Sequence, residues 1–292
     1  MSDVILTADG ESVTLHGGAF AGHGIALTGL SGWYQTPDAK VTVTSRGQGD
    51  GGHDIVADNV MYDARVVTVG YRIIAGSDRE EALRQLALLD KLVHRLVTCR
   101  VIDDGQDTCC SGGYYVRSLE QKIQNPLWQN LSGDITLVFE RPERLSTTAQ
   151  RCQLLPSISS DRVGLSYGSA ARGLAYPLSY GAAAVDARNV CTLTNDGSSR
   201  AYPVFTVQGP WPDGVQLTFP GLDMSLDYAQ AVGSVPLVLD SRSRTASIGG
   251  LDVSRNLRQR GFPTVPPGGS TAVNLQSIGN GYVSIECHDT YM

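Results

Sequence analysis

The chain has 292 residues, of which 41% are hydrophobic and 18% are charged, a composition typical of globular proteins rather than disordered ones. No apolar run approaches the roughly 18 residues needed to cross a membrane, and residues 1–9 lack the basic and apolar stretches of a secretory signal. The net charge of −6 argues against a protein that grips nucleic acid through its phosphates.

The net negative charge of the chain comes entirely from its first half. Residues 1–146 carry 13 basic and 19 acidic side chains, whereas residues 147–292 carry 10 of each. An acidic surface repels the DNA backbone and lets DNA slide past without sticking.

The first half is predicted to contain strands and one helix. Alternating apolar residues predict strands at 40–46, 66–74, 114–119 and 134–140. Between the second and third of these, Ser77 and Glu80 fit a capping box that begins a helix. Leucines and valines then recur at spacings of three and four, which predicts an amphipathic helix to about Cys99.

The second half is predicted to be entirely β. Its expected strands are 201–208, 215–219, 235–239, 245–248, 271–275 and 282–287. Turn residues separate them at intervals of about 8–15 residues, the spacing of sandwiches and barrels. A polar break near residues 141–150 divides the chain into an N-terminal β domain with one helix, 1–146, and a C-terminal β-sandwich, 147–292.

The six cysteines show no CxxC motif and no zinc-ligand spacing. Because no secretory signal is found, we expect them to be free thiols.

Catalytic motifs are weak throughout the sequence. Residues 164–168 match the G-x-S-x-G pattern around Ser166, but Pro177 soon forbids the helix that such an elbow requires, and the only later histidine is His288. The glycine- and aspartate-rich loops near residues 50 and 104 lack the regularly spaced oxygen ligands of a Ca²⁺ site. We therefore predict no enzyme, no cofactor and no metal site.

An ordered series of short motifs runs through the second half: GLAYPL at 173–178, NDG at 195–197, AYPVFTVQGP at 201–210, VPLVLD at 235–240, PGGSTAV at 267–273 and HDTYM at 288–292. This series resembles the C-terminal domain of siphophage distal tail proteins, the Dit family, often called minor tail proteins in actinobacteriophages. The first half fits the same family through its strand-rich start, its glycine-rich loop after Arg46 and the helix beginning after Gly76.

The resemblance implies a mainly β fold, with an N-terminal domain similar to tail-tube proteins and a C-terminal galectin-like or jelly-roll sandwich. It implies a structural protein of the virion tail tip, assembled in the host cytoplasm. Six copies would form a ring that joins the tail tube to the tail-tip hub, with DNA passing through its lumen. The implied partners are the major tail tube protein, the tape measure protein, the tail-associated hub protein and receptor-binding proteins, without membrane insertion.

The acidic first half suggests which residues could face the lumen or the neighbouring copies of a ring. The candidates are Asp50, Asp54, Asp103, Asp104 and Asp107.

An alternative is a carbohydrate-binding tail protein that recognises a host cell-wall glycan through its C-terminal sandwich. Aromatic residues available for stacking on a sugar include Trp33, Tyr34, Tyr114 and Trp211. A third hypothesis for the function is a tail-bound hydrolase.

Overall fold

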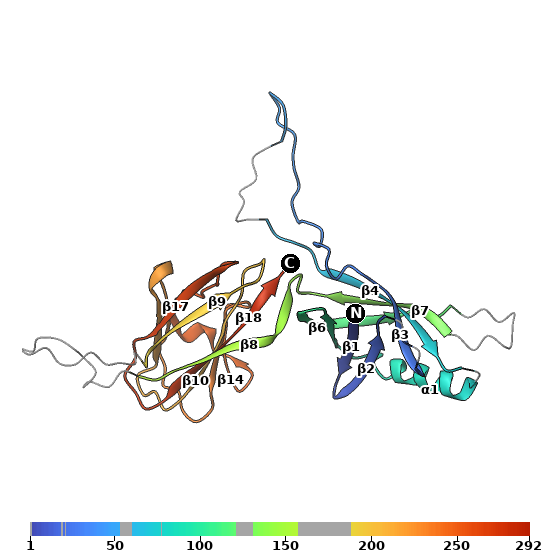
Figure 1. Cartoon of the computed structure of the whole chain (residues 1–292). Helices are drawn as coiled ribbons and strands as arrows, with labels where there is room; N and C mark the ends of the chain where they lie inside the picture. The colour runs from blue at the N-terminus through green and yellow to red at the C-terminus, as the bar shows by residue number, and fades with distance from the viewer. Residues whose placement is uncertain are drawn as a thin grey trace, which may run out of the picture. The chain divides into compact units, whose positions relative to one another are not determined.

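The structure is a computed structural model that describes residues 2–18, 20, 22–52, 60–76, 78–120, 131–156 and 188–292. It is mainly β, and the chain divides into two compact units (Figure 1). We call Met1–Thr148 with Thr290–Met292 the barrel unit, and Ala149–Asp289 the sandwich unit. Two strands, β8 (Arg144–Leu154) and β18 (Tyr282–Tyr291), run from one unit into the other. Residues 141–150, expected to form a polar break, therefore lie largely within a strand.

The described part of the barrel unit contains a closed sheet of seven strands. They are β1 (Asp3–Ala8), β2 (Glu11–His16), β3 (Gly24–Ser31), β4 (Arg65–Ile74), β5 (Val97–Asp103), β6 (Gln106–Arg117) and β7 (Leu131–Phe139). β6 is hydrogen-bonded to β7 as well as to β5, so the order β5-β1-β2-β3-β4-β7-β6 closes on itself. Neighbouring strands are antiparallel except β2 and β3, which are parallel. Closure removes the free edges to which another chain could add a strand.

Every second residue of the strands fills the barrel interior. In β1 the inward Val4 and Leu6 are fully buried, and the same alternation continues in β4. It confirms the strand predicted at 66–74. The strands predicted at 114–119 and 134–140 overlap β6 and β7, although both of these begin earlier.

The helix α1 (Arg79–Asp90) begins close to where the sequence predicts it. Its N-cap is Asp78, whose carboxylate accepts hydrogen bonds from the amides of Glu80 and Glu81 at 2.9 and 3.2 Å. These bonds satisfy two of the amides that a helix start leaves without partners. The predicted cap, Ser77, lies outside the described residues.

The predicted end of the helix is wrong, because α1 stops at Asp90 and not near Cys99. His94 has a φ of 65°, in the left-handed region, and residues from Val97 onward pair with β1 and β6 as β5. Leu96, expected on the apolar stripe of the helix, is instead 68% exposed. No helix in the described residues has the length and apolar character needed to cross a membrane.

An arm, residues 32–64, leaves the barrel between β3 and β4 and projects from it in Figure 1; its residues 53–59 lie outside the described part. The strand predicted at 40–46 falls in this arm and is wrong. In the described part of the arm, the β pairing is limited to isolated bridges between Ala39 and Tyr62 and between Ser45 and Gly52. Val43 alternates with threonines as in a strand, but no neighbouring strand covers it and it is 58% exposed.

Arg65, the first residue of β4, anchors the root of the arm and is fully buried. Its Nη1 donates to the carbonyl oxygens of Gly32, Trp33 and Gln35 at 2.7, 2.7 and 2.8 Å, and its Nε donates to that of Pro142 at 2.6 Å. Gly32 has a φ of 78°, and a Cβ there would lie 2.0 Å from a backbone oxygen of β4. Only glycine therefore fits the turn at which the arm begins.

The sandwich unit consists of two sheets. The first has the order β15-β14-β13-β10-β18-β8 and the second the order β16-β12-β11-β17-β9. The new strands are β9 (Val190–Asn195), β10 (Val204–Gln208), β11 (Val215–Phe219), β12 (Met224–Tyr228), β13 (Leu237–Asp240), β14 (Thr245–Ile248), β15 (Leu251–Asp252), β16 (Leu257–Arg260) and β17 (Gly269–Leu275), with two short 3-10 helices, η3 (Pro220–Leu222) and η4 (Ser254–Asn256). The strands predicted at 215–219 and 245–248 coincide with β11 and β14. The predictions at 201–208, 235–239, 271–275 and 282–287 overlap β10, β13, β17 and β18.

The two sheets of the sandwich pack over an apolar core in which the rings of Phe205 and Phe219 lie 5.8 Å apart. A disulfide joins Cys152 on β8 to Cys191 on β9, the last strand of each sheet within this unit. The prediction that all six cysteines are free is therefore wrong for this pair. Cys99, Cys109, Cys110 and Cys287 are free.

We expect Arg65→Met to lower the free energy of unfolding by about 3 kcal/mol, because one buried and three partly buried carbonyl oxygens lose their donor. Arg72→Met, on the exposed face of the same strand, serves as the control and should cost less than about 0.5 kcal/mol. Urea unfolding followed by circular dichroism measures both. Coinciding unfolding curves for the two variants would contradict the anchoring role.

We expect reduction of the Cys152–Cys191 disulfide to lower the free energy of unfolding by about 4 kcal/mol, because the bond closes a loop across a sequence separation of 39 residues. Thermal unfolding with and without a phosphine reductant measures the change. The double variant Cys152→Ser, Cys191→Ser should be insensitive to the reductant, whereas Cys109→Ser should respond like the natural chain. A melting temperature that reductant does not move would count against the bond.

Candidate interaction surfaces

The five acidic residues predicted as lumen or ring contacts do not lie together. Asp103, Asp104 and Asp107 belong to the β5–β6 hairpin, whereas Asp50 is exposed on the arm. Asp54 lies outside the described residues. The hairpin therefore concentrates three of the acids at one turn.

Two of the hairpin acids have specific partners. Arg100 Nε and Nη2 donate to Asp107 Oδ1 and Oδ2 at 2.8 and 2.5 Å, and this bidentate bond lowers the pKa of the Asp107 carboxyl. The Tyr34 hydroxyl donates to Asp103 Oδ2 at 2.8 Å, which lowers the pKa of that carboxyl. Both side chains are therefore ionised at neutral pH and held in one orientation.

Tyr34 also connects the root of the arm to β8. Its ring lies 5.0 Å from the guanidinium carbon of Arg144, a residue that is itself buried. Burial, followed by the hydrogen bond to Asp103, raises the pKa of Tyr34 to about 12. Tyr34 thus stays protonated and bridges the arm, the β5–β6 hairpin and Arg144, the first residue of β8.

The outer wall of the barrel carries apolar side chains at neighbouring positions on three strands, and those on β4 and β6 are exposed whereas Val138 on β7 is half-buried. Val66 lies opposite Val138, which in turn lies opposite Tyr114, and Val116 is two residues further along β6. Val66, Tyr114 and Val116 are 51%, 54% and 55% exposed. We call these four residues the apolar strip. Adjacent exposed apolar side chains on a sheet face are typical of a surface that another protein covers.

Sequence reasoning missed the apolar strip, although a signal for it exists. Tyr114, Tyr115 and Val116 are consecutive, so both faces of β6 are apolar there, while only the face with Tyr115 points into the core.

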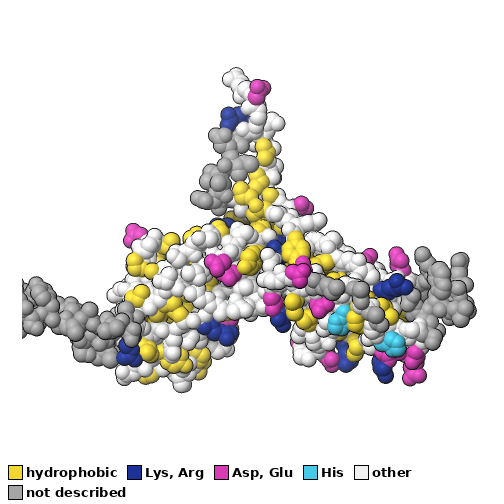
Figure 2. All heavy atoms as spheres, viewed as in Figure 1, with side chains coloured by type: hydrophobic (Ala, Val, Ile, Leu, Met, Phe, Trp, Pro, Cys, Tyr) yellow, Lys and Arg dark blue, Asp and Glu magenta, His cyan; other side chains and the backbone are white. Residues whose placement is uncertain are grey.

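The arm adds further exposed apolar surface through Val43 and Met61, which are 58% and 63% exposed. Hydrophobic side chains are visible along the arm in Figure 2.

The residues described by the structure contain no group of three or more His, Cys, Asp or Glu side chains that could hold a metal ion. The G-x-S-x-G match at 164–168 lies outside them. Of the aromatic residues considered for sugar stacking, Trp33 and Trp211 are fully buried and belong to the two cores.

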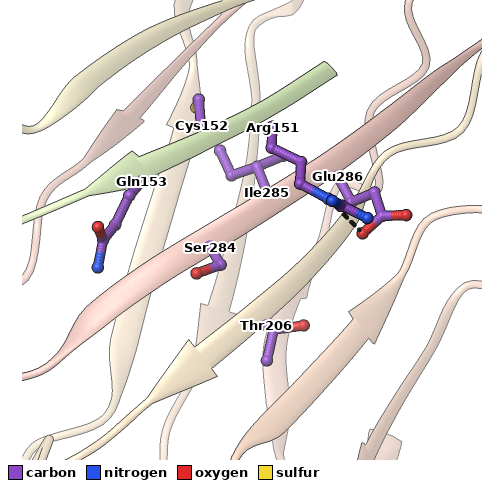
Figure 3. A pocket seen from close by; sticks show the side chains of 7 residues that line it. All are labelled: Arg151, Cys152, Gln153, Thr206, Ser284, Ile285 and Glu286. Atoms are coloured by element: carbon purple, nitrogen blue, oxygen red, sulfur yellow. Dashed lines mark hydrogen bonds and ion pairs between the residues drawn. The ribbon is translucent and has the colours of Figure 1, made fainter. Parts of the chain in front are cut away.

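A hollow of about 310 Å³ lies on the outer face of the first sheet of the sandwich unit, across β8, β18 and β10 (Figure 3). Its floor is formed by Thr206 and Ser284, which are register partners on β10 and β18. Longer side chains, Arg151 and Gln153 on β8 and Glu286 on β18, surround these two short ones. We call this feature the polar hollow.

The charges in the polar hollow balance one another. Arg151 Nε lies 3.3 Å from Glu286 Oε2, and His288 Nε2 lies 3.1 Å from Glu286 Oε1. Burial alone would raise the pKa of the Glu286 carboxyl, but the hydrogen bonds from Arg151 and His288 outweigh it and lower that pKa. The hollow therefore contains an ion pair among uncharged polar groups.

The sequence matches no family model and no curated protein. Its fold, however, is similar to that of solved phage tail structures. The chain matches the Dit protein of phage SPP1, described as a paradigm of the hub adsorption apparatus in phages that infect Gram-positive bacteria, with a TM-score of 0.62 and 10% identity over 99% of both chains.

Two structures of the phage P2 baseplate in its activated conformation are also similar. The one with Ca gives a TM-score of 0.52 at 10% identity over 99% of this chain and 98% of that one, and the one with Sr gives 0.52 at 10% over 98% of each. The likeness extends over both units. It confirms the mainly β fold expected from the sequence, a barrel-like domain with one helix followed by a β-sandwich.

Proposed function

We propose that this chain is a structural distal tail protein of a long, non-contractile phage tail, located at the tail tip of the virion, and that it is not an enzyme. The observation that supports the proposal most strongly is the likeness to the SPP1 Dit protein over 99% of both chains, which takes in both units of this chain. The disulfide of the sandwich unit supports a place in the virion, since disulfides persist in oxidising surroundings such as virion surfaces.

The barrel unit has the surface that a closed ring requires. Copies in a ring meet head to tail, so each copy must present two different complementary surfaces. The apolar strip is one such surface, and the arm with exposed Val43 and Met61 is another. We propose that the arm of one copy covers the apolar strip of the next and that six copies close the ring.

The acidic residues fit the lumen of such a ring. We propose that Asp50, Asp54 and the hairpin acids Asp103, Asp104 and Asp107 line the lumen or the contacts between copies. The charge of Asp107 is balanced by Arg100, so repulsion of the DNA backbone would come from the other ionised carboxylates, repeated around the ring, and would let the DNA slide through. The ring would join the major tail tube protein to the tail-associated hub protein, receive the tape measure protein and carry receptor-binding proteins, after assembly in the host cytoplasm.

We expect the double substitution Tyr114→Glu, Val116→Glu to leave the chain folded but monomeric, because buried carboxylates at the ring contact would cost several kcal/mol per copy. Leu251→Glu, at a 74% exposed apolar position of the sandwich unit, is the matched control and should still assemble. Mass photometry of the full chains gives the number of copies. A natural chain that stays single at all concentrations would overturn the ring, and assembly of the double variant would overturn the role of the strip.

We expect a reconstruction of the ring by electron microscopy to place Asp103, Asp104 and Asp107 on the inner wall. The charge-reversing substitution Asp104→Lys should then make the ring retain double-stranded DNA at low salt and release it as salt is raised. Filter binding with linear DNA measures this retention, with Asp227→Lys in the sandwich unit as the control. Finding the hairpin acids on the outer wall would refute their assignment to the lumen.

A further inference from the structure

The polar hollow has the properties of a binding site for a small uncharged ligand. The side chains of Gln153, Thr206 and Ser284 make no hydrogen bond within the described residues, although all three line the hollow. They supply donors and acceptors side by side, since hydroxyl and amide groups offer both. A ligand that carries several hydroxyl groups would satisfy them together.

The hollow arises from the register of the sheet. Thr206 and Ser284 lie opposite each other and point away from the core, because their neighbours Phe205 and Ile285 are buried. Two short side chains facing each other leave a depression between the longer side chains on either side (Figure 3). Its volume of about 310 Å³ is at the lower limit of ligand pockets, so the ligand is of the size of one ring.

The charged side chains of the hollow contact one another. Glu286 lies between Arg151 and His288, so its carboxylate is shared by two basic side chains, and the rest of the hollow is lined by uncharged side chains. Tyr282, 37% exposed, lies two residues before Ser284 on the same face of β18. Its ring provides an apolar plane of the kind that packs against the apolar face of a sugar.

We propose that the polar hollow binds a single neutral sugar ring of a cell-surface glycan, with Thr206, Ser284 and Gln153 bonding its hydroxyl groups and Tyr282 packing against its face. The Arg151–Glu286 pair lies at one end of the site and offers a donor and an acceptor. This binding is independent of ring assembly, because every residue of the hollow belongs to the sandwich unit.

The test is saturation-transfer NMR of the full chain with the methyl glycosides of glucose, galactose, mannose, rhamnose and N-acetylglucosamine at millimolar concentration. We expect transfer to at least one of them. Ser284→Phe fills the hollow and should weaken binding at least tenfold, and Thr206→Val, which removes one hydroxyl at nearly constant volume, should weaken it several-fold. Ser270→Phe, on an exposed position of β17 in the other sheet, should bind like the natural chain.

Two outcomes would overturn the proposal. One is the absence of transfer to every glycoside, and the other is equal binding by Ser284→Phe and Ser270→Phe. Displacement of the bound glycoside by inorganic phosphate would show an anion site instead and would also overturn it. Because mass photometry of the same variants reports assembly separately, loss of sugar binding with intact assembly distinguishes this site from the ring.

Discussion

A buried guanidinium holds the root of the arm in place. The side chain of Arg65 donates hydrogen bonds to backbone carbonyl oxygens of residues 32–35 and to that of Pro142. Burial lowers the pKa of Arg65, but arginine begins so far above neutral pH that the group stays charged. A buried charge is tolerated only when polar groups surround it, and here those groups are carbonyl oxygens. The position of Tyr34, and through it the link to the β5–β6 hairpin, depends on this arrangement.

Closure of the barrel decides what kind of surface remains for assembly. Because β6 pairs on both sides, the seven described strands leave no open edge for another strand, and side chains and the arm are the surfaces they leave for contacts with other chains. The two units accordingly present different chemistry: the barrel unit has exposed valines and tyrosine on its outer wall, whereas the sandwich unit has a polar hollow on the outer face of a sheet. Apolar surface suits a permanent contact, and a neutral polar hollow suits a reversible one.

The sequence predicts strands well where alternation is short and bounded by turns, as at 215–219 and 245–248. It fails where local pattern and tertiary pairing compete. The predicted helix is too long because the valines and leucines after Asp90 match a helical spacing. Pairing with β1 nevertheless makes the residues from Val97 onward a strand. At 40–46 the reverse holds, since an alternating pattern has no strand to pair with.

The candidate interaction surfaces are harder to predict, because they too depend on which strands pair and in which register. The apolar strip becomes visible only when the register of β4, β7 and β6 brings Val66, Val138 and Tyr114 into one row. The polar hollow likewise requires Thr206 opposite Ser284, residues that are 78 positions apart in the sequence. Asp103, Asp104 and Asp107 lie together because they are neighbours in the chain. Their assignment to a lumen, like that of the Asp50 loop, rests on the acidity of two loops and stays a prediction.

The disulfide and the polar hollow are coupled through β8. Cys152 points toward the second sheet, where it bonds Cys191, so its neighbours Arg151 and Gln153 must point to the outer face, because side chains alternate along a strand. The covalent bond therefore fixes the strand whose two outward side chains form one wall of the hollow. A wall held in place loses less entropy when a ligand binds than one that must first be ordered. The same bond that links the edges of the two sheets would thus also hold one wall of the hollow in place for the proposed ligand.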